Sequence, residues 1–305
     1  MACTIKPEEI KRVKGLGFLN NKGTNLFNGR VVTVNGKITA EQTRAIADAA
    51  EKYGTGEVEF TTRLSVEIRG IPFEDIEAFR ACIVKAGLET GGTGPLVRPI
   101  VSCKGTTCQY GLYDTFALSE EFHKRFYKAY HTVKLPHKFK IAVGGCPNNC
   151  VKPDVNDMGI IGRRLSTIHT ELCKTCKNCK IEAACPMGAA KVEGDAITRD
   201  ASLCNFCGRC IGKCPFDAIE EGPTVYKIHI GGRWGKKVAR GRSLSKLFTE
   251  KEVFDIVESA ILLFREQGKA GERFADTIER IGMEEVERQL VSGEVLQRKE
   301  SILAE

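Results

Sequence analysis

The sequence has no apolar run as long as a membrane-spanning helix requires. Its first residues, MACTIKPEEIKRV, lack the apolar stretch of a signal peptide, so we expect a cytoplasmic protein. Aromatic residues make up only 7%, and no basic run is interleaved with them, so the net charge of +7 does not indicate nucleic acid as a partner. Five scattered histidines lack ligand spacing (His123, His131, His137, His169 and His229).

No flavin or nicotinamide motif is visible, so electrons for any redox reaction must come from another protein. The 305 residues are enough for two or three compact units, and the 42% hydrophobic and 28% charged content is that of an ordinary globular protein. Cysteine is plentiful: there are 14. In a reducing compartment this number favours metal ligation over disulfides.

Residues 135–150, LPHKFKIAVGGCPNNC, combine two lysines and two cysteines. Lys138 and Lys140 are two apart on an expected strand, so their ammonium groups should point to the same face. The strand ends at a Gly-Gly pair, and Cys146 and Cys150 follow in a tight turn. An earlier pair, Cys103 and Cys108, offers two more ligands. Spacing alone would also allow a zinc site.

Together with Thr61-Thr62-Arg63 and Val97-Arg98-Pro99, this stretch resembles the sirohaem-dependent sulfite and nitrite reductase family, over most of the chain. The likeness is strongest to the anaerobic, dissimilatory-type sulfite reductase catalytic subunit. It implies a 4Fe-4S cluster on four cysteines, of which Cys150 also bridges to sirohaem iron (Cys103, Cys108, Cys146 and Cys150). It also implies an anion-binding quartet of basic residues (Arg63, Arg98, Lys138 and Lys140). The family commonly has five residues between the first two cysteines; here there are four.

Two further cysteine runs, at 173–185 and 204–214, repeat each other: their first three cysteines are offset by 31 residues each, and the first run has two more residues before its last cysteine. The second matches the bacterial ferredoxin run, in which the fourth cysteine serves the other cluster. We therefore expect one 4Fe-4S cluster on Cys173, Cys176, Cys179 and Cys214. The other should be held by Cys204, Cys207, Cys210 and Cys185. Zinc is the alternative, and eight cysteines at this spacing disfavour it. Cys3 and Cys82 remain, and Cys82 reads as a buried inert thiol.

The predicted fold class is α+β with an inserted bacterial 2x(4Fe-4S) ferredoxin domain. Residues 1–28 look like an extended arm with little regular structure, and 29–90 like a ferredoxin-like half-domain. Residues 91–164 plus 223–305 would form the sirohaem and 4Fe-4S domain, interrupted by the ferredoxin insert at 165–222. The glycine-rich residues 90–95 are expected to be a linker; the alternative is a cradle that binds sirohaem carboxylates through its backbone N–H groups.

Capping signals predict helices at 39–53, with Thr39 and Gln42 as a capping box, and at 249–267, with its apolar stripe in the core. Further helices are expected at 72–87 and 119–130, and one or two short ones over 273–290. Strands are expected at 30–34, 158–161 and 225–230, and one or two over 57–68.

The charge is uneven, because residues 165–222 hold seven Lys and Arg and eight Asp and Glu, which leaves +8 on the rest. This surplus suits a polycarboxylate macrocycle and a dianionic substrate, and equally a merely basic solvated surface. The resemblance implies a sulfite reductase that carries out the six-electron reduction of sulfite to sulfide, with electrons entering through the ferredoxin insert. The alternatives are a nitrite reductase, which typically has Asn in place of Lys140, and a non-catalytic electron-transfer or sirohaem-binding subunit.

The implied partners are sulfite and an electron donor, either a ferredoxin or a reductase subunit. The family's single-chain enzymes contain this body twice, with the basic residues of one copy facing the cluster of the other. This chain has one copy, which carries both the basic residues and the cluster cysteines. We therefore expect a homodimer or higher oligomer in which the basic quartet of one subunit faces the sirohaem bound through Cys150 of its neighbour.

Overall fold

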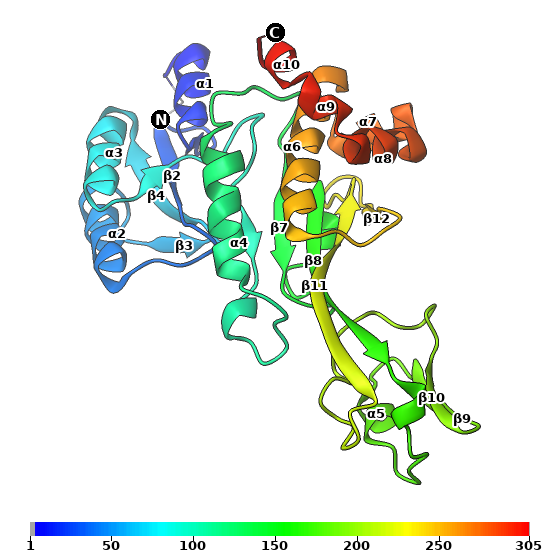
Figure 1. Ribbon diagram of the computed structural model, residues 1–305. Coiled ribbons are helices and arrows are strands. Elements are labelled where there is room, and N and C mark those ends of the chain that lie inside the picture. The colour runs from blue at the N-terminus through cyan, green and yellow to red at the C-terminus, as the bar shows by residue number, and fades with distance from the viewer. Residues whose placement is uncertain (1–3, 305) are drawn as a thin grey trace.

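The computed structural model describes residues 4–304. It has an N-terminal sheet with helices, a central sheet covered by helices, and a small cysteine-rich unit that extends away from both (Figure 1). The predicted α+β class is confirmed. No helix within residues 4–304 combines the length and apolarity needed to cross a membrane.

The N-terminal sheet is antiparallel and is built around β2 (Leu26–Val32). Its other strands are β1 (Phe18–Asn20), β3 (Val58–Phe60), β4 (Val66–Pro72) and β5 (Glu89–Thr90). Helices α2 (Ala40–Tyr53) and α3 (Ile76–Lys85) share its core. The predicted capping box is confirmed, because Thr39 and Gln42 exchange backbone-to-side-chain bonds of 3.0 and 3.1 Å at the start of α2. Cys82 packs against this core.

The predicted arm is wrong, because residues 4–28 contain regular structure. Helix α1 (Pro7–Gly15) begins with proline in its first turn, and β1 pairs with β2. Val13 and Phe18 are fully buried in the N-terminal core. The glycines that suggested a loop make turns between short elements: Gly17 has φ +104°. Cys3 lies outside the described residues.

The central sheet has the order β12-β11-β8-β7-β6. Strands β6 (Val101–Ser102), β7 (Ile141–Gly144) and β8 (Met158–Ile168) run parallel. Strands β11 (Ile219–Ile230) and β12 (Arg242–Ser243) complete it in antiparallel fashion. Its core contacts α6 (Glu250–Gln267) and α4 (Thr115–Phe122), which continues as a π-helix (His123–Lys128). The predicted cap of α6 at Thr249 and its buried stripe are confirmed.

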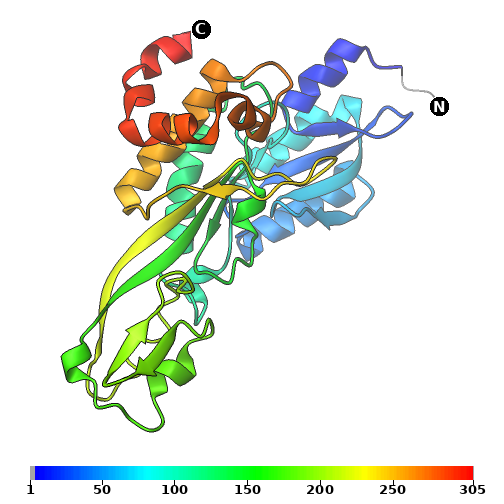
Figure 2. The ribbon, with the colours of Figure 1, turned by 90° about the vertical axis from the view of Figure 1, so that its right-hand side faces the viewer.

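Strands β8 and β11 extend well beyond the expected 158–161 and 225–230. They pair over most of their length and leave the body as a two-stranded ribbon with the insert at its far end (Figures 1 and 2). The register shifts between Glu221 and Thr224, and Arg164 lies opposite Thr224. The domain boundaries predicted at 164/165 and 222/223 therefore fall inside this ribbon.

The insert has little regular structure: α5 (Lys180–Ala184), β9 (Ala190–Glu193) and β10 (Ala196–Arg199). Its small core consists of Ile181, Ala190, Ile197, Ala218 and Ile219. Five cysteines pack against these residues: Cys173, Cys179, Cys185, Cys210 and Cys214. An apolar centre of this size requires additional cross-linking to hold one structure.

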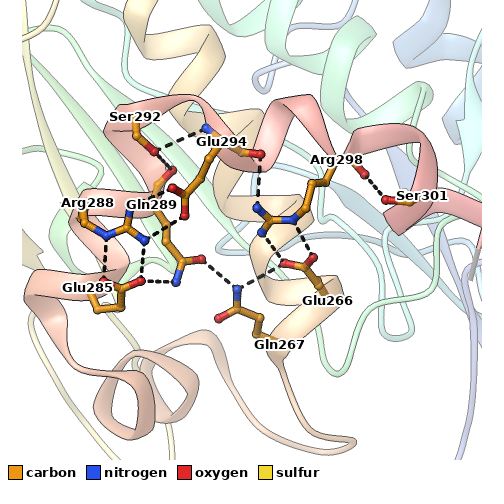
Figure 3. Close-up of polar contacts among 9 residues, drawn as sticks. All are labelled: Glu266, Gln267, Glu285, Arg288, Gln289, Ser292, Glu294, Arg298 and Ser301. Carbon is orange, nitrogen blue, oxygen red and sulfur yellow. Dashed lines mark hydrogen bonds and ion pairs between the residues drawn. The ribbon is translucent and has the colours of Figure 1, made fainter.

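The chain closes with α7 (Phe274–Ile281), α8 (Met283–Ser292), α9 (Glu294–Gln297) and α10 (Lys299–Ala304). The short helices expected over 273–290 are confirmed, and the last two were not predicted. Arg298 donates twice to Glu266 of α6, both at 3.0 Å (Figure 3). Arg288 pairs with both Glu285 and Glu294. The Arg298–Glu266 pair thus links the terminal helices to α6, and the Arg288 pairs link α8 to α9.

Candidate active site

A cavity of about 320 Å³ lies between the N-terminal and central sheets. Six basic residues line it and no acidic side chain does: Lys14, Arg30, Arg63, Arg98, Lys138 and Lys140. All four basic residues named from the sequence are thus brought together, from three separate segments. Lys14 of α1 and Arg30 of β2 join them.

Lys138 and Lys140 stand on either side of Phe139, which is fully buried and bridges to Val97. This alternation sends both ammonium groups into the cavity, as predicted. Strand β7 itself begins one residue later, at Ile141. The two lysines therefore lie at its amino end.

The two predicted arginines connect the N-terminal and central sheets. Arg63 lies in the turn between β3 and β4 and donates to Asn156 Oδ1 at 2.9 Å and to the Pro99 carbonyl at 2.7 Å. The backbone N–H of Arg98 donates to the carbonyl of Phe139 at 2.8 Å. Its guanidinium donates to the carbonyl of Gly92. Each guanidinium is therefore held by main-chain or amide oxygens, which leave its positive charge uncompensated.

The glycine-rich residues 90–95 are not a free linker. Gly91, Gly92 and Thr93 are buried. Arg30 Nη1 donates to the Gly92 carbonyl at 3.0 Å, and Thr93 Oγ1 donates to the carbonyl of Lys14. The segment is packed because its glycines permit close approach to the basic residues, and it forms part of the cavity wall.

Burial, reinforced by neighbouring cations, lowers the pKa of each basic residue named from the sequence. The pKa of Arg63 and of Arg98 falls to about 10. That of Lys140 falls to about 8, and that of Lys138 falls as well. Burial and mutual repulsion thus disfavour the charged forms of these four side chains. A bound anion would stabilise the charged forms.

The first cysteine group lies at the carboxyl ends of two adjacent parallel strands. Cys103 follows β6 and Cys146 follows β7. The N–H of Gly145 donates to Cys103 Sγ at 3.2 Å. Burial raises the pKa of the Cys146 thiol, and the nearby Cys103, Cys150 and Cys108 raise it further. The four thiols therefore share one region, in which Cys150 is exposed.

Strand β7 separates the basic cavity from these cysteines. Lys140 precedes its first residue and Gly145 follows its last. Four residues of strand span about 13 Å. None of the four cysteines lines the basic cavity. One subunit therefore presents its cations and its thiols at opposite ends of the same strand.

Four insert cysteines line a single cavity: Cys185, Cys204, Cys207 and Cys210. They are the set expected to share one cluster. Burial opposes ionisation of Cys185, but the N–H groups of residues 187–190 outweigh it and lower its pKa. Of the other set, Cys173, Cys179 and Cys214 pack against the insert core, and Cys176 is exposed.

No three His, Cys, Asp or Glu side chains within residues 4–304 converge as a single metal ion would require. A 4Fe-4S cluster is held by four cysteine thiolates, and hydrogen bonds to the sulfurs tune it. Both the groups of four thiols and the hydrogen bonds to sulfur are present. The thiols are grouped in fours around Cys146 and around Cys207. Backbone N–H groups donate to the sulfurs of Cys103 and Cys185. The residues fit such a cluster.

Residues 93–299 match the nitrite and sulphite reductase 4Fe-4S domain, and residues 20–85 match the nitrite/sulfite reductase ferredoxin-like half domain. The chain belongs to the nitrite and sulphite reductase family. The resemblance seen in the sequence is thereby confirmed.

An uncharacterised protein of Methanocaldococcus jannaschii is 33% identical to this reductase-family chain, over 84% of the chain and 87% of the relative. The coenzyme F420-dependent sulfite reductase of the same organism is 32% identical over 79% of the chain, which spans only 38% of that enzyme. The crystal structure of dissimilatory sulfite reductase I superposes with a TM-score of 0.70 at 22% identity, covering 88% of this chain and 69% of that one. This last likeness shows the shared fold.

Sequence reasoning missed several residues of this reductase-family site. Arg30 lines the cavity and pairs with Glu67 through an Nε–Oε1 bond of 2.8 Å. Asp157 is fully buried and binds Arg273 with both carboxylate oxygens, at 2.9 and 2.8 Å. Arg30 lies in the phase of β2 opposite to the core residues Phe27 and Val31, so the alternation of the strand did not mark it as a site residue. Nothing in the local sequence marks Asp157 or Arg273.

Proposed function

We propose that this chain is a sirohaem-dependent sulfite reductase that carries out the six-electron reduction of sulfite to sulfide. The observation that carries the proposal is the cavity lined by six cations and no carboxylate. A small, highly charged oxyanion is the ligand that such a cavity favours. The sulfite reductases among the relatives support the same substrate.

The cationic residues have distinct tasks in this reaction. Sulfite takes up six electrons and seven protons and gives hydrosulfide and three waters. Arg63 and Arg98 hold the oxygens as charge builds on them. Lys138 and Lys140 supply protons to the departing oxygens, and a pKa of about 8 suits Lys140 to proton transfer near neutral pH. Sirohaem, when bound, supplies the electron-rich iron that binds sulfur.

We assign three 4Fe-4S clusters to the twelve cysteines. The sirohaem-coupled cluster takes Cys103, Cys108, Cys146 and Cys150, with Cys150 as the bridge to sirohaem. The insert holds one cluster on Cys204, Cys207, Cys210 and Cys185, and another on Cys173, Cys176, Cys179 and Cys214. Two observations support this assignment. Cys185, Cys204, Cys207 and Cys210 line one cavity, and the apolar core of the insert is small.

Electrons enter at the insert from a separate low-potential donor, a ferredoxin or a reductase subunit. The insert suits this role because it stands away from the body on the ribbon of β8 and β11 (Figure 2). Cys207 and Arg209 border the same hollow as Tyr110 and Leu112, which follow Cys108. This insert loop is therefore next to the loop of the sirohaem-coupled cluster.

The active site is completed by a second copy of the chain. Strand β7 holds the cations and the thiols at opposite ends, and Cys150 is exposed. In a homodimer or higher oligomer, the cavity of one subunit faces the sirohaem bound through Cys150 of its neighbour. Mixing a Lys138→Ala chain with a Cys150→Ala chain should restore one working site per mixed dimer. No recovery in verified mixed dimers would refute the shared site.

The function is tested by the optical spectrum and iron content of anaerobically purified protein, followed by sulfite or nitrite with a low-potential donor. Sirohaem bands with sulfide production are expected. Faster turnover of nitrite would make the chain a nitrite reductase. Iron-sulfur absorption without sirohaem, even after reconstitution, would leave a non-catalytic electron-transfer subunit.

A further inference from the structure

The turn that carries Cys150 is held in a conformation that its sequence disfavours. Asn149 and Lys152, before and after Cys150, have φ of +57° and +49°, values that residues other than glycine adopt uncommonly. Two backbone bonds close the turn, from the N–H of Asn149 to the Cys146 carbonyl at 3.3 Å and from that of Lys152 to the Asn149 carbonyl at 2.8 Å. Cys150 itself is exposed. Because such backbone strain persists only where surrounding contacts determine it, the turn needs support from outside.

Asp154 supplies this support from the single helical turn that follows, Pro153–Val155. Its side chain is buried, with 8% exposed, and its Oδ1 accepts a hydrogen bond from Asn149 Nδ2 at 2.8 Å. Asn149 is covalently bonded to Cys150. The carboxylate therefore fixes the residue that immediately precedes the thiol.

The other carboxylate oxygen is held by a distant loop of residues 233–240, which we call the Arg240 loop. An antiparallel bridge between Arg233 and Ala239 closes this loop. Asp154 Oδ2 accepts from Arg240 Nε at 2.8 Å and lies 2.7 Å from Arg240 Nη2. The next residue, Gly241, donates its N–H to the Asp154 carbonyl at 2.6 Å. Both carboxylate oxygens thus accept from N–H donors, which is the arrangement that suits an ionised carboxylate.

Asp154 differs in its contacts from Asp157, which lies three residues further on. Asp157 has no exposed surface and joins the start of β7 to Arg273 at the start of α7, so it stabilises the body of the protein. Asp154 contacts two loops instead, and Arg240, its charged partner, is 79% exposed. An arginine so open to solvent gains little stability from an ion pair. The position of the Cys150 turn is therefore the better account of why a carboxylate is buried here.

We propose that Asp154 is a positioning residue for Cys150: through Asn149 it holds the thiol where one sulfur can bridge the 4Fe-4S cluster and the sirohaem iron. The proposal rests on the function and the cluster assignment given above. A bridging sulfur must meet two metal centres at once, and a site of this kind tolerates displacements of only about 0.5 Å. Asp154 does not line the basic cavity, so its role is separate from the binding of substrate.

The test is an optical titration with sirohaem of full-length protein that has been produced without it and purified anaerobically. Asp154→Ala should bind sirohaem about 10–100-fold more weakly than the unaltered protein, the usual effect of removing a group that orients a metal ligand. Electron paramagnetic resonance of the loaded variant should show weaker magnetic coupling between sirohaem and the cluster, because the two centres share the Cys150 sulfur. The iron of the two insert clusters should not change.

Asn149→Gly removes the same contact from its other side. Glycine accepts a φ of +57° readily, so this variant loses the amide and keeps the backbone of the turn. It should also weaken sirohaem binding, and adding it to Asp154→Ala should weaken binding no further, because both substitutions remove one interaction. Asn149→Gly decides the question if Asp154→Ala does not fold.

Asp276→Ala is the matched control. Asp276 Oδ1 accepts from Arg233 Nη1 at 2.6 Å, which ties the Arg240 loop to α7. This variant removes a carboxylate partner of the same loop and leaves the bond between Asp154 and Asn149 in place. It should bind sirohaem as the unaltered protein does. Equal weakening in Asp276→Ala and Asp154→Ala would overturn the proposal, because the loop rather than the turn would then be responsible.

The same titration separates this proposal from the function on which it rests. Full sirohaem affinity and unchanged magnetic coupling in both Asp154→Ala and Asn149→Gly would overturn the role of Asp154 and leave the proposed function intact. If the unaltered protein binds no sirohaem, the proposed function fails, and the role of Asp154 fails with it.

Discussion

The backbone N–H of Lys140 donates to Asp157 Oδ2 at 2.9 Å, and the same carboxylate binds Arg273. Asp157 has no exposed surface, and the side chain of Arg273 is 15% exposed. One buried carboxylate thus joins the start of β7, next to Lys138 and Lys140, to the start of α7. Its loss would affect both the position of Lys140 and the attachment of the C-terminal helices.

Asp157→Ala should lower the free energy of unfolding by about 3–5 kcal/mol, because it leaves a buried arginine without its partner. Urea denaturation of the purified protein measures this. Glu77→Ala removes an exposed partner of Arg80 and should cost less than about 1 kcal/mol. Equal losses of unfolding free energy in the two variants would show that the buried pair contributes no more to stability than the exposed one.

Sulfite affinity should fall as pH rises through about 8, the pKa of Lys140 in the free cavity. Below that pH the ammonium is charged and attracts the anion; above it the charge is lost, so affinity falls by up to about tenfold between pH 8 and 9. Sulfite dissociation constants measured across this range test the expectation. In Lys140→Arg the decline should move to higher pH, and an unchanged profile there would rule out Lys140 as the titrating group.

Lys140→Asn should lower sulfite turnover by about 10²–10³, the cost of removing one preorganised donor. Nitrite turnover should fall less, because nitrite carries a smaller charge and loses fewer oxygens. The ratio of the two rates is the measurement, and Lys236→Asn in an exposed loop is the control. A parallel decline with both substrates would mean that Lys140 does not select between them.

Double substitutions test the crossed ligand assignment of the insert. Cys185 lies with Cys207 in one cavity, so Cys185→Ser with Cys207→Ser should lose no more iron than either single variant. Cys179→Ser with Cys207→Ser should lose about twice as much, because two clusters are affected. Iron analysis after anaerobic purification distinguishes these cases. Additive loss in the first pair would mean that Cys185 belongs to the other cluster.

Gly162→Ala should reduce iron content by about one third, the share of the sirohaem-coupled cluster. Its Cβ would lie 2.5 Å from a ring carbon of Tyr113, and Tyr113 donates to the Gly144 carbonyl at 3.0 Å. The loop that carries Cys146 would have to move. Gly235→Ala, where nothing lies within 4 Å, should keep its full iron content. Full iron in both variants would show that the loop tolerates the displacement.

Features set by neighbouring residues could be predicted from the sequence. The capping box at Thr39 and the cap at Thr249 were predicted correctly because a cap depends on four consecutive residues. The expectation that Lys138 and Lys140 share a face was also correct, since it follows from the strand period alone. The grouping of these lysines with Arg63 and Arg98 came from the family resemblance, and no local rule contains it.

Features set by distant contacts could not be predicted. The arm was misread because its glycines and asparagines resemble a loop, whereas Val13 and Phe18 are held by a core formed elsewhere. The outer half of β8 is polar and is a strand only because β11 pairs with it. The role of Arg30 could not be predicted from its neighbours in the sequence, because the fold brings it to distant residues such as Arg63 and Glu67.

The ribbon of β8 and β11 also bears on how such a chain could arise. Arg164 and Thr224 face each other across the two strands, so the insert departs from and returns to neighbouring points. Joining those points by a short turn would close the body without rearranging its sheet. The cysteine-rich insert is in this sense a replaceable module: descent could exchange or discard it while the basic cavity, at the amino end of β7, stayed intact.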